Sequence, residues 1–475
     1  MKPTPVIAIF DIGKTNKKFF LFNEQYKIVL ERTVQFEEMI DEDGFACDNL
    51  QQLSEWVHQT IKEIKDTEEF DVKAFNFSAY GASFVHIGED GKPVAPLYNY
   101  LNPYPPELKE KFYNTYGGEM KVSVRTASPV LGNLNSGMQL YYLKNKKKDL
   151  FDKIKYSLHL PQYISYLVTG KTFSDITSIG SHTVLWDFTK NNYHDWVQAE
   201  NIQAKLAPIF PSNAVIEAIV NNREVKAGIG LHDSSAALIP YLASFSEPFV
   251  LLSTGTWCIS LNPFNDSPLT EDELKNDCLF YINYTGHPVK ASRIFAGNEH
   301  EQQIKRLADH FNKSWDYYTT VGYNAEILSS LKRDSSINDQ GGMQVILHSS
   351  AFTERDLSLF KNYEEAYHQL IFDIIVQQAG STQLVLKETD VRRIFVDGGF
   401  SKNVVYMFML ASVFPQIEVF AASVAQASAI GAALAIHQHW NSKNLPLDIV
   451  ELKKYCFTQP ILYESGFIDS LMADQ

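Results

Sequence analysis

The stretch FDIGKTNKK, residues 10–18, decides the fold, because it joins two strand-like runs through a short polar turn. The run Val6–Phe10 before it has the length and β-branched content of a buried strand, and Phe19–Phe22 follows almost at once. The hairpin tip is Gly13-Lys14-Thr15-Asn16. Such a tip is usually an ordinary solvent turn, but its glycine, N–H groups and polar side chains also suit phosphate oxygens.

Composition limits the classes of partner. The 475 residues favour two large domains, and 45% hydrophobic residues are enough for a sizeable core in each. The net charge is −14, and an acidic chain repels polyanions, so we expect no nucleic-acid partner. The basic run Lys144–Lys148 is read as the solvated end of a helix.

The cysteines and the N-terminus favour a reducing compartment. The four cysteines are Cys47, Cys258, Cys278 and Cys456. They are far apart and match no metal-ligand spacing, so free or buried thiols are expected. The first apolar run is too short for a signal peptide, and no stretch is long enough to span a membrane. The sequence therefore predicts a soluble, cytoplasmic protein without a membrane partner.

Strand-like and helix-like segments alternate along the chain, which predicts the α/β class. A helix is expected over 50–64 and a buried strand over 75–78. A second helix is expected over 158–167, ending at Thr169-Gly170. Residues 118–139 contain scattered Gly and Pro and are expected to be rich in loops.

A second hairpin repeats the first in pattern. The strand-like run Phe249–Ser253 continues into the turn Ser253–Thr256 and a further apolar run. Taken alone this is a routine β-turn. Residues 6–22 and 249–262 nevertheless share one arrangement, which predicts two related halves. We place the boundary at residue 245, giving domains 1–245 and 246–475.

Two further segments carry glycine or aspartate next to a helix start. In IFVDGGFSKN, residues 394–403, a strand meets Gly398-Gly399 and a helix is expected near Ser401, with Ser401 as its N-cap. In GIGLHDSSAAL, residues 228–238, Asp233 begins an Ala-rich helix. Aspartate there is usually a cap, and the alternative is a general base for phosphoryl transfer. Asp11 would then hold Mg²⁺ or position phosphates.

Together these blocks resemble the FGGY family of carbohydrate kinases, over about Val6 to Ile436. FDIGKTN and LLSTGTW resemble the two phosphate motifs, and DGGFSKN the adenosine motif. Residues 160–187 resemble the family's block around Pro161, and residues 425–436 the helix that closes the nucleotide pocket. The resemblance implies two ribonuclease-H-like lobes of the actin-like ATPase type with a cleft between them. It assigns the sugar to 1–245 and the nucleotide to 246–475.

The resemblance implies an ATP- and Mg²⁺-dependent kinase with Asp233 as its general base. The residues expected to bind ATP and its phosphates are Asp11, Gly13, Lys14, Thr15, Asn16, Thr254, Gly255, Thr256, Gly398, Gly399 and Asn403. Those expected to bind the sugar are Gly81, Ala82, Ser83, Asn102, His232 and Asp233. The metal is assigned to Asp11.

The His-Asp-Ser form of the 228–238 block is similar to rhamnulokinases and fuculokinases, which implies a 6-deoxy-ketohexose such as L-fuculose or L-rhamnulose. A pentulose kinase and a non-catalytic sugar-sensing protein on the same fold remain alternatives. A polymerising actin-like ATPase is disfavoured by the Asp233 block. A homodimer is the default oligomer.

Several positions depart from the family pattern. Tyr100-Leu101-Asn102-Pro103-Tyr104 stands where Trp-x-Asp-x-Arg is frequent, which predicts a less charged or differently shaped sugar pocket. Tyr98, Tyr100 and Tyr104 are candidates for stacking on a sugar face. The lysine usual near Ser136–Met138 is missing, Gln426 replaces a frequent Glu, and Lys14 is expected to add a phosphate contact.

Overall fold

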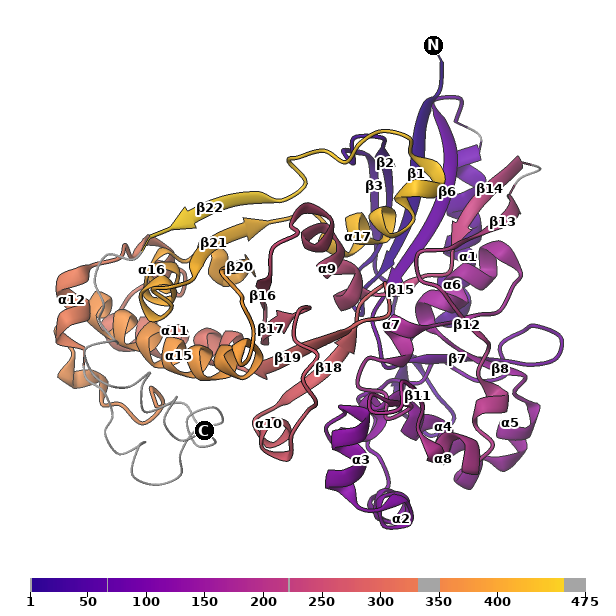
Figure 1. Ribbon diagram of the computed structural model, residues 1–475, viewed down its shortest axis with the longest axis horizontal. Helices are drawn as coiled ribbons and strands as arrows, with labels where there is room; N and C mark the ends of the chain where they lie inside the picture. The colour runs from indigo at the N-terminus through magenta and orange to yellow at the C-terminus, as the bar shows by residue number, and fades with distance from the viewer. Residues whose placement is uncertain (1, 66, 221–222, 332–350, 457–475) are drawn as a thin grey trace. The chain divides into compact units, whose positions relative to one another are not determined.

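The computed structural model describes residues 2–65, 67–220, 223–331 and 351–456 (Figure 1). The chain divides into two compact units, each composed of several segments. The first contains Met1–Ser244, Phe280–Pro288 and Ala425–Ile449, and the second contains Phe245–Leu279, Val289–Val424 and Val450–Gln475. The domain boundary at residue 245 stays a prediction, since these units interleave along the chain.

The first unit is built on a seven-stranded sheet of order β13-β14-β6-β1-β2-β3, with β15 also paired to β6. Its strands are β1 (Thr4–Ile12), β2 (Lys17–Asn23), β3 (Ile28–Val34), β6 (Phe70–Ala79), β13 (Val215–Val220), β14 (Arg223–Gly228) and β15 (Leu231–His232). Strand β1 pairs antiparallel with β2 and parallel with β6. The hairpin expected from the opening stretch is confirmed, and a hydrogen bond from Gly13 N to Asn16 O (2.9 Å) closes its turn.

Helices bury both faces of this sheet. Val6, Ala8 and Phe10 of β1 share one apolar cluster with residues of α1 (Leu50–Lys65) and α6 (Leu160–Thr169). Helix α17 (Ala427–Ala435) contacts β1 and β6 and packs against α9 (Asp233–Ser244). The continuous apolar run of β1 follows from this double burial, because successive side chains point to opposite faces.

A smaller layer of the first unit has its own apolar core around Phe112, Tyr141 and Trp196. Its helices are α2 (Pro106–Tyr116), α3 (Glu119–Thr126), α4 (Ser136–Lys146), α5 (Lys148–Lys153), α7 (Ile176–Ile179) and α8 (Asp195–Ala199), and the short helix α18 (His437–Trp440) lies near the end of the unit. The short strands of the first unit are β4 (Met39–Ile40), β5 (Ala46–Cys47), β7 (Phe84–Ile87), β8 (Tyr156–His159), β9 (Ser174–Asp175), β10 (Trp186–Asp187), β11 (Asn192–Tyr193) and β12 (Ile209–Phe210).

The loop-rich expectation for 118–139 is wrong, because α3 and the start of α4 occupy much of it. Gly118 and Gly132 both adopt a positive φ. Gly118 immediately precedes α3, and Gly132 begins the short turn before α4, so these glycines mark helix boundaries. The helix expected over 158–167 is confirmed from Leu160 onward, whereas residues 158–159 belong to β8.

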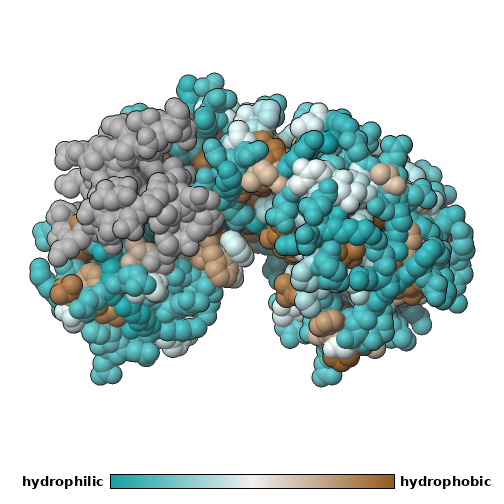
Figure 2. All heavy atoms as spheres, turned by 90° about the horizontal axis from the view of Figure 1, so that it is seen from below, coloured by the Kyte–Doolittle hydropathy of each residue, from teal (hydrophilic) through white to brown (hydrophobic). Residues whose placement is uncertain are grey.

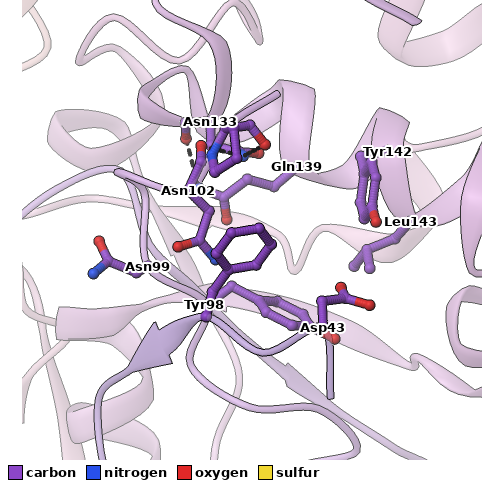
Figure 3. A pocket seen from close by; sticks show the side chains of 10 residues that line it. Asp43, Tyr98, Asn99, Asn102, Asn133, Gln139, Tyr142 and Leu143 are labelled. Atoms are coloured by element: carbon purple, nitrogen blue, oxygen red, sulfur yellow. Dashed lines mark hydrogen bonds between the residues drawn. The ribbon is translucent and has the colours of Figure 1, made fainter. Parts of the chain in front are cut away.

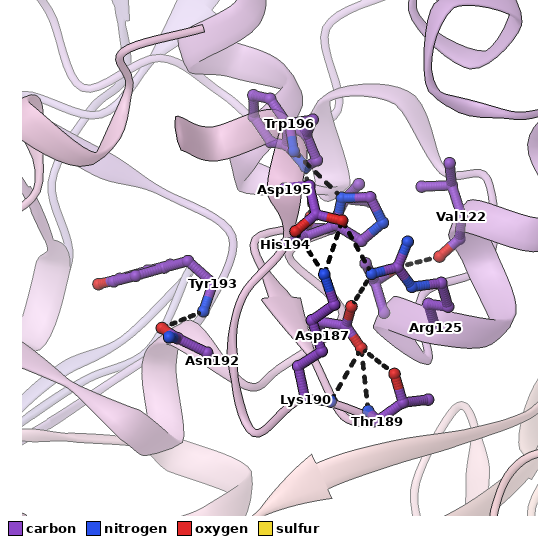
Figure 4. A network of polar contacts seen from close by, with 12 residues as sticks. Val122, Arg125, Asp187, Thr189, Lys190, Asn192, Tyr193, His194, Asp195 and Trp196 are labelled. Carbon is purple, nitrogen blue, oxygen red and sulfur yellow. Dashed lines mark hydrogen bonds and ion pairs between the residues drawn. The ribbon is translucent and has the colours of Figure 1, made fainter. Parts of the chain in front are cut away.

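A polar network ties α3 to the segment that contains β10 and α8 (Figure 4). Arg125 pairs with the fully buried carboxylate of Asp187 and with Asp195 (3.2 Å). Asp187 also accepts hydrogen bonds from Thr189 N (2.9 Å) and Thr189 Oγ1 (2.6 Å). Burial tends to raise the pKa of Asp187, but the Thr189 and Arg125 hydrogen bonds outweigh it and hold that pKa below its ordinary value.

Replacing Arg125 with Met is expected to destabilise the first unit by about 3 kcal/mol at pH 7, because the Asp187 carboxylate then stays buried without its cation. A lowered pKa contributes stability above the unfolded pKa that is lost as the pH falls through the folded value. The difference between the variant and the wild type should therefore shrink below about pH 4. Urea unfolding followed by tryptophan fluorescence, at pH 7 and below about pH 4, measures the difference in unfolding free energy between the variant and the wild type. An equal difference at the two pH values would contradict this explanation.

The second seven-stranded sheet has the order β18-β19-β17-β16-β20-β21-β22. Its strands are β16 (Phe249–Thr254), β17 (Cys258–Asn262), β18 (Cys278–Ile282), β19 (Pro288–Ile294), β20 (Arg393–Gly398), β21 (Glu418–Ser423) and β22 (Glu451–Tyr455). Strand β16 pairs antiparallel with β17 and parallel with β20, as β1 does with β2 and β6. The repeated hairpin expected at 249–262 is therefore confirmed.

The helices of the second unit are α10 (Glu271–Lys275), α11 (Ala296–Phe311), α12 (Ala325–Ser330), α15 (Tyr363–Leu386) and α16 (Val404–Val413). Helix α15 is buried along most of its length and contacts α11, α16 and β17. The short 3₁₀ helices of the chain are η1 (Gly132–Leu134), η2 (Gln203–Lys205), η3 (Tyr317–Thr320), η4 (Leu357–Leu359) and η5 (Gly399–Lys402).

The surface carries few large apolar groups on the face shown in Figure 2, where hydrophilic residues predominate and hydrophobic ones form small separate groups. Within the described ranges, no helix has the length and apolarity required to cross a lipid bilayer. All four cysteines are free thiols, and three of them are buried.

Candidate functional site

Asp11 lies near the end of β1, just before the turn, where its carboxylate is enclosed by other parts of the first unit. Its Oδ2 accepts a hydrogen bond from Ser428 Oγ (2.8 Å) of helix α17. Burial raises the pKa of Asp11 to about 6, the Ser428 hydrogen bond lowers it, and the charge of Asp233 raises it again. Asp11 and Asp233 therefore act on each other electrostatically within the first unit.

This pair of carboxylates suits Mg²⁺. Two interacting carboxylates, one of them largely desolvated, repel each other, and a bound cation relieves that repulsion. No group of three or more His, Cys, Asp or Glu side chains is placed to hold a metal among the residues that the structure describes. One or two carboxylates completed by phosphate oxygens and water is the usual arrangement for Mg²⁺.

We expect turnover to rise with pH between about 5 and 7, with a midpoint near the Asp11 pKa of about 6. The carboxylate form is needed to attract a cation, and protonation removes its charge. Folding stability should run the other way. A raised carboxyl pKa stabilises the fold at low pH, and that contribution is lost as the pH rises from 3.8 to about 6. Asp11→Asn should abolish both trends, and an unchanged activity profile in this variant would contradict the role of Asp11.

The turn that follows Asp11 is tight, and its lysine is already paired. Lys14 Nζ contacts Asp48 Oδ2 (2.5 Å) and Glu38 Oε1 (3.2 Å). Asn16 Oδ1 accepts a hydrogen bond from Gln35 Nε2 (2.8 Å). The Thr15 side chain is exposed, and the turn is held without it. The phosphate contact expected of Lys14 stays a prediction, and it would require the ammonium to leave or share these carboxylates.

Asp48 is a residue that sequence reasoning missed. It accepts hydrogen bonds from Lys14 Nζ, from Lys17 Nζ (3.4 Å) and from the Tyr80 hydroxyl (2.9 Å). It thus connects the turn at 13–16 with the turn that begins at Tyr80. Helix α1 begins at Leu50 and is capped by Asn49, which accepts a hydrogen bond from Gln52 N (3.0 Å), so only the three-dimensional contacts identify Asp48.

The expected sugar turn, Tyr80–Ser83, lies against the His232-Asp233 block. A Cβ on Gly81 would come within 2.7 Å of His232 Nε2, so any larger residue would displace the imidazole. Ala82 has a positive φ of 61°, a conformation that is uncommon outside glycine. Its carbonyl accepts a hydrogen bond from Gln139 Nε2 (2.7 Å). The structure thus brings Gly81 against His232, next to Asp233, and the sugar-binding role of these residues stays a prediction.

Asp233 begins helix α9 with a partly exposed carboxylate. Its Oδ1 accepts a hydrogen bond from Ser234 N (2.6 Å) and lies 3.4 Å from His232 Nε2. Burial lowers the pKa of His232 and the charge of Asp233 raises it, with burial dominant, so the imidazole is neutral at neutral pH. His232 also stacks on Tyr281, with ring centroids 6.0 Å apart. An anchored yet accessible carboxylate of this kind is suited to accepting a proton.

The second unit brings the expected nucleotide residues together at the ends of β16 and β20, where Thr254 is paired with Gly398. Gly398 has a φ of +93°, and a Cβ there would lie 2.0 Å from Thr254 O, so glycine is required. The Thr254 hydroxyl is already engaged. It donates to Asp397 O (2.6 Å) and accepts from Phe400 N (3.0 Å), which holds the two strand ends together.

The N-cap expected at Ser401 is wrong, because α16 begins at Val404 and Asn403 caps it. Asn403 Oδ1 accepts from Val405 N (3.1 Å), and its Nδ2 donates to the Tyr367 hydroxyl (2.8 Å). The 3₁₀ helix η5 occupies the place expected for the first helical turn. The other expected residues of this unit, Gly255, Thr256 and Gly399, lie in the two turns next to Thr254 and Gly398.

Helix α17, expected at 425–436, is confirmed and belongs to the first unit. Gln426, which precedes it, accepts a hydrogen bond from Lys18 Nζ (3.0 Å). Gly431 of α17 meets α9 so closely that a Cβ would lie 1.8 Å from Ala236 O. Because α17 carries Ser428 and α9 begins with Asp233, this close packing positions both carboxylates of the site.

Two family models match almost the whole chain. The model described as the FGGY family of carbohydrate kinases, N-terminal domain, matches residues 6–239. The model described as carbohydrate kinase FGGY, C-terminal domain, matches residues 246–444. Together they include every block that carried the resemblance.

Individual relatives are distant. A rhamnulokinase of Oceanobacillus iheyensis is 20% identical over 438 residues, which is 89% of this chain and 90% of that protein. An L-fuculokinase of Escherichia coli is 22% identical over 277 residues, covering 53% of this chain and 55% of that protein. The crystal structure of a carbohydrate kinase from Novosphingobium aromaticivorans superposes with a TM-score of 0.79 at 21% identity, over 99% of this chain and 98% of that one. This likeness confirms the α/β fold of the actin-like type.

Proposed function

The chain belongs to the FGGY family of carbohydrate kinases, and we propose that within it the acceptor is a 6-deoxy-ketohexose such as L-fuculose or L-rhamnulose. As a member the protein is a sugar kinase, and FGGY kinases use ATP with Mg²⁺. The observation that carries the proposal is the His232-Asp233 pair, held against Gly81 at the start of α9. The relatives named rhamnulokinase and L-fuculokinase support the same class of acceptor.

In the proposed reaction Asp233 accepts the proton of the acceptor hydroxyl. The hydroxyl oxygen forms a bond to the γ-phosphorus of ATP, the bond to the β–γ bridging oxygen breaks, and ADP leaves. Mg²⁺ supplies charge neutralisation on the phosphates when it is bound. Neutral His232 positions the Asp233 carboxylate through its Nε2.

The residues assigned to phosphates lie in the turns that follow β1, β16 and β20. Backbone N–H groups of glycine-containing turns are suited to anionic oxygens. In the first unit this role is proposed for Gly13, Thr15 and Asn16. In the second it is proposed for Gly255, Thr256 and the Gly398-Gly399 turn, with Thr254 holding the strand ends in place through its two hydrogen bonds.

A coupled ADP-release assay with Mg²⁺-ATP tests the acceptor. The panel contains L-fuculose, L-rhamnulose, D-xylulose, L-ribulose and glycerol. We expect the highest kcat/KM with one of the two L-configured 6-deoxy sugars. A clear preference for D-xylulose or L-ribulose would favour the pentulose alternative, and release that none of the sugars stimulates would contradict the proposed acceptor class.

A further inference from the structure

The first unit contains a polar pocket (Figure 3). The pocket opens to solvent, and about 450 Å³ of space lies within it and its mouth. Asn102, Asn133 and Gln139 gather on one wall, Tyr142 and Leu143 stand on another, and Tyr98 and Asp43 lie below. We propose that this pocket, which we call the amide pocket, binds an uncharged, hydroxyl-rich ligand, either the far end of the acceptor sugar or a second sugar molecule.

The amide groups of the pocket are fixed by their nitrogen atoms. Gln139 Nε2 donates to Ala82 O (2.7 Å) and to Asn133 O (2.6 Å). Asn133 Nδ2 donates to Asn102 O (2.9 Å) and more weakly to Pro103 O (3.3 Å). These bonds hold each side chain in one orientation, so its carbonyl oxygen is fixed as well. Such pre-organisation lowers the entropy cost of binding.

The acceptor atoms on these groups are left for a ligand. Within residues 2–65, 67–220, 223–331 and 351–456, no group hydrogen-bonds Gln139 Oε1, Asn133 Oδ1 or the Tyr142 hydroxyl. None of these three atoms is sealed from solvent either. Carbonyl oxygens accept hydrogen bonds from hydroxyl groups, which are the main donors of a sugar.

The charges around the pocket exclude an anion. Asp43, the only ionisable carboxylate or cation among the lining residues, pairs with Lys147 (2.5 Å). Lys147 is shared with Glu42 (2.6 Å), so its charge is already balanced. A phosphate would meet two fixed carbonyl oxygens without a free cation, whereas an uncharged polyol would not. Phe45 and Tyr98 add aromatic surface on which the C–H face of a sugar can pack.

Gln139 connects the amide pocket with the proposed acceptor site, so the inference rests on the proposed function. Gln139 holds the carbonyl of Ala82, one residue from Gly81, which packs on His232 next to Asp233. Asn102, expected to bind sugar, lines the same pocket. The pocket is thus joined to the turn proposed to hold the sugar through Gln139 and Asn102.

Binding measured without nucleotide separates this inference from catalysis. Calorimetry with L-rhamnulose and L-fuculose is compared for the wild type, Phe45→Ala and Asn102→Ala, with inorganic phosphate as the charged probe. Phe45 is half-exposed and makes no side-chain hydrogen bond, so its removal should leave the fold intact. Matched controls are Ile40→Ala on the same hairpin and Leu101→Ala beside Asn102, since both side chains are exposed and outside the pocket.

We expect both pocket variants to weaken sugar binding about five- to tenfold, the controls to bind like the wild type, and phosphate not to compete. If the acceptor itself enters the pocket, one sugar binds per chain and KM rises in parallel with kcat unchanged. If a second sugar occupies it, the wild type binds two sugars and the variants lose one without a change in KM.

Several outcomes would overturn the inference. They are wild-type affinity and stoichiometry in both pocket variants, no sugar binding by the wild type, or competition by phosphate. Sugar binding that depends on Phe45 and Asn102 in a protein that phosphorylates none of the panel would refute the proposed acceptor class and leave the pocket standing.

Discussion

Replacing Asp233 with Asn is expected to lower kcat at least ~100-fold while the protein still folds, the usual scale for the loss of a general base. The amide is nearly isosteric, and its oxygen can still accept the hydrogen bond from Ser234 N that anchors the carboxylate now. What is lost is the ability to take a proton. The partly exposed position of Asp233 means that the substitution buries no unpaired group.

The measurement is steady-state ADP release with the best acceptor, together with the binding affinity for that acceptor. Asp149→Asn is a matched control, since it removes an exposed carboxylate from the first turn of α5, far along the chain from the site. The control should keep wild-type turnover. Near-wild-type kcat in Asp233→Asn, in a protein that unfolds like the wild type, would show that another group accepts the proton.

The two hairpins were predictable from sequence because their signals are local. An apolar, β-branched run followed by a glycine-containing turn and a second apolar run specifies a strand pair within about twenty residues. Burial on both faces makes the runs continuous, as in β1 and β16. The placement of Asp233 at a helix start was equally local, since an Ala-rich helix follows two glycines there.

Long-range contacts were not predictable in the same way. Asp48 joins Lys14 and Tyr80, which are 34 and 32 residues away, and nothing in the sequence near Asp48 names those partners. Ser401 and Asn403 are both good N-caps, and the choice depends on how η5 packs against Thr254. The amide pocket depends on the meeting of Asn102 from a loop, Asn133 from η1 and Gln139 from α4.

Gly431→Ala is expected to destabilise the first unit by about 3 kcal/mol and to lower turnover with it. Alanine usually stabilises a helix relative to glycine by about 1 kcal/mol, so a buried mid-helix glycine indicates close packing. Here a Cβ would lie 1.8 Å from the backbone oxygen of Ala236, and a backbone atom cannot move aside like a flexible side chain. Helices α17 and α9 must therefore separate.

That separation reaches the site directly. Helix α17 carries Ser428, which hydrogen-bonds Asp11, and α9 begins at Asp233. Moving the helices apart loosens both carboxylates at once, and catalysis depends on sub-ångström positioning. Asp11 without its Ser428 hydrogen bond also loses a contact that lowers its pKa, so the rise of activity with pH should shift to higher pH.

Thermal unfolding and the pH profile of turnover test this prediction, with a fall in Tm of roughly 6–12 °C expected for a unit of this size. Gly322→Ala is the control, because a Cβ there meets nothing within 4 Å, and it should change Tm little. Wild-type stability in Gly431→Ala would mean that the helices tolerate separation. Lost stability with an unchanged pH profile would mean instead that Asp11 is held independently of the packing of α17 on α9.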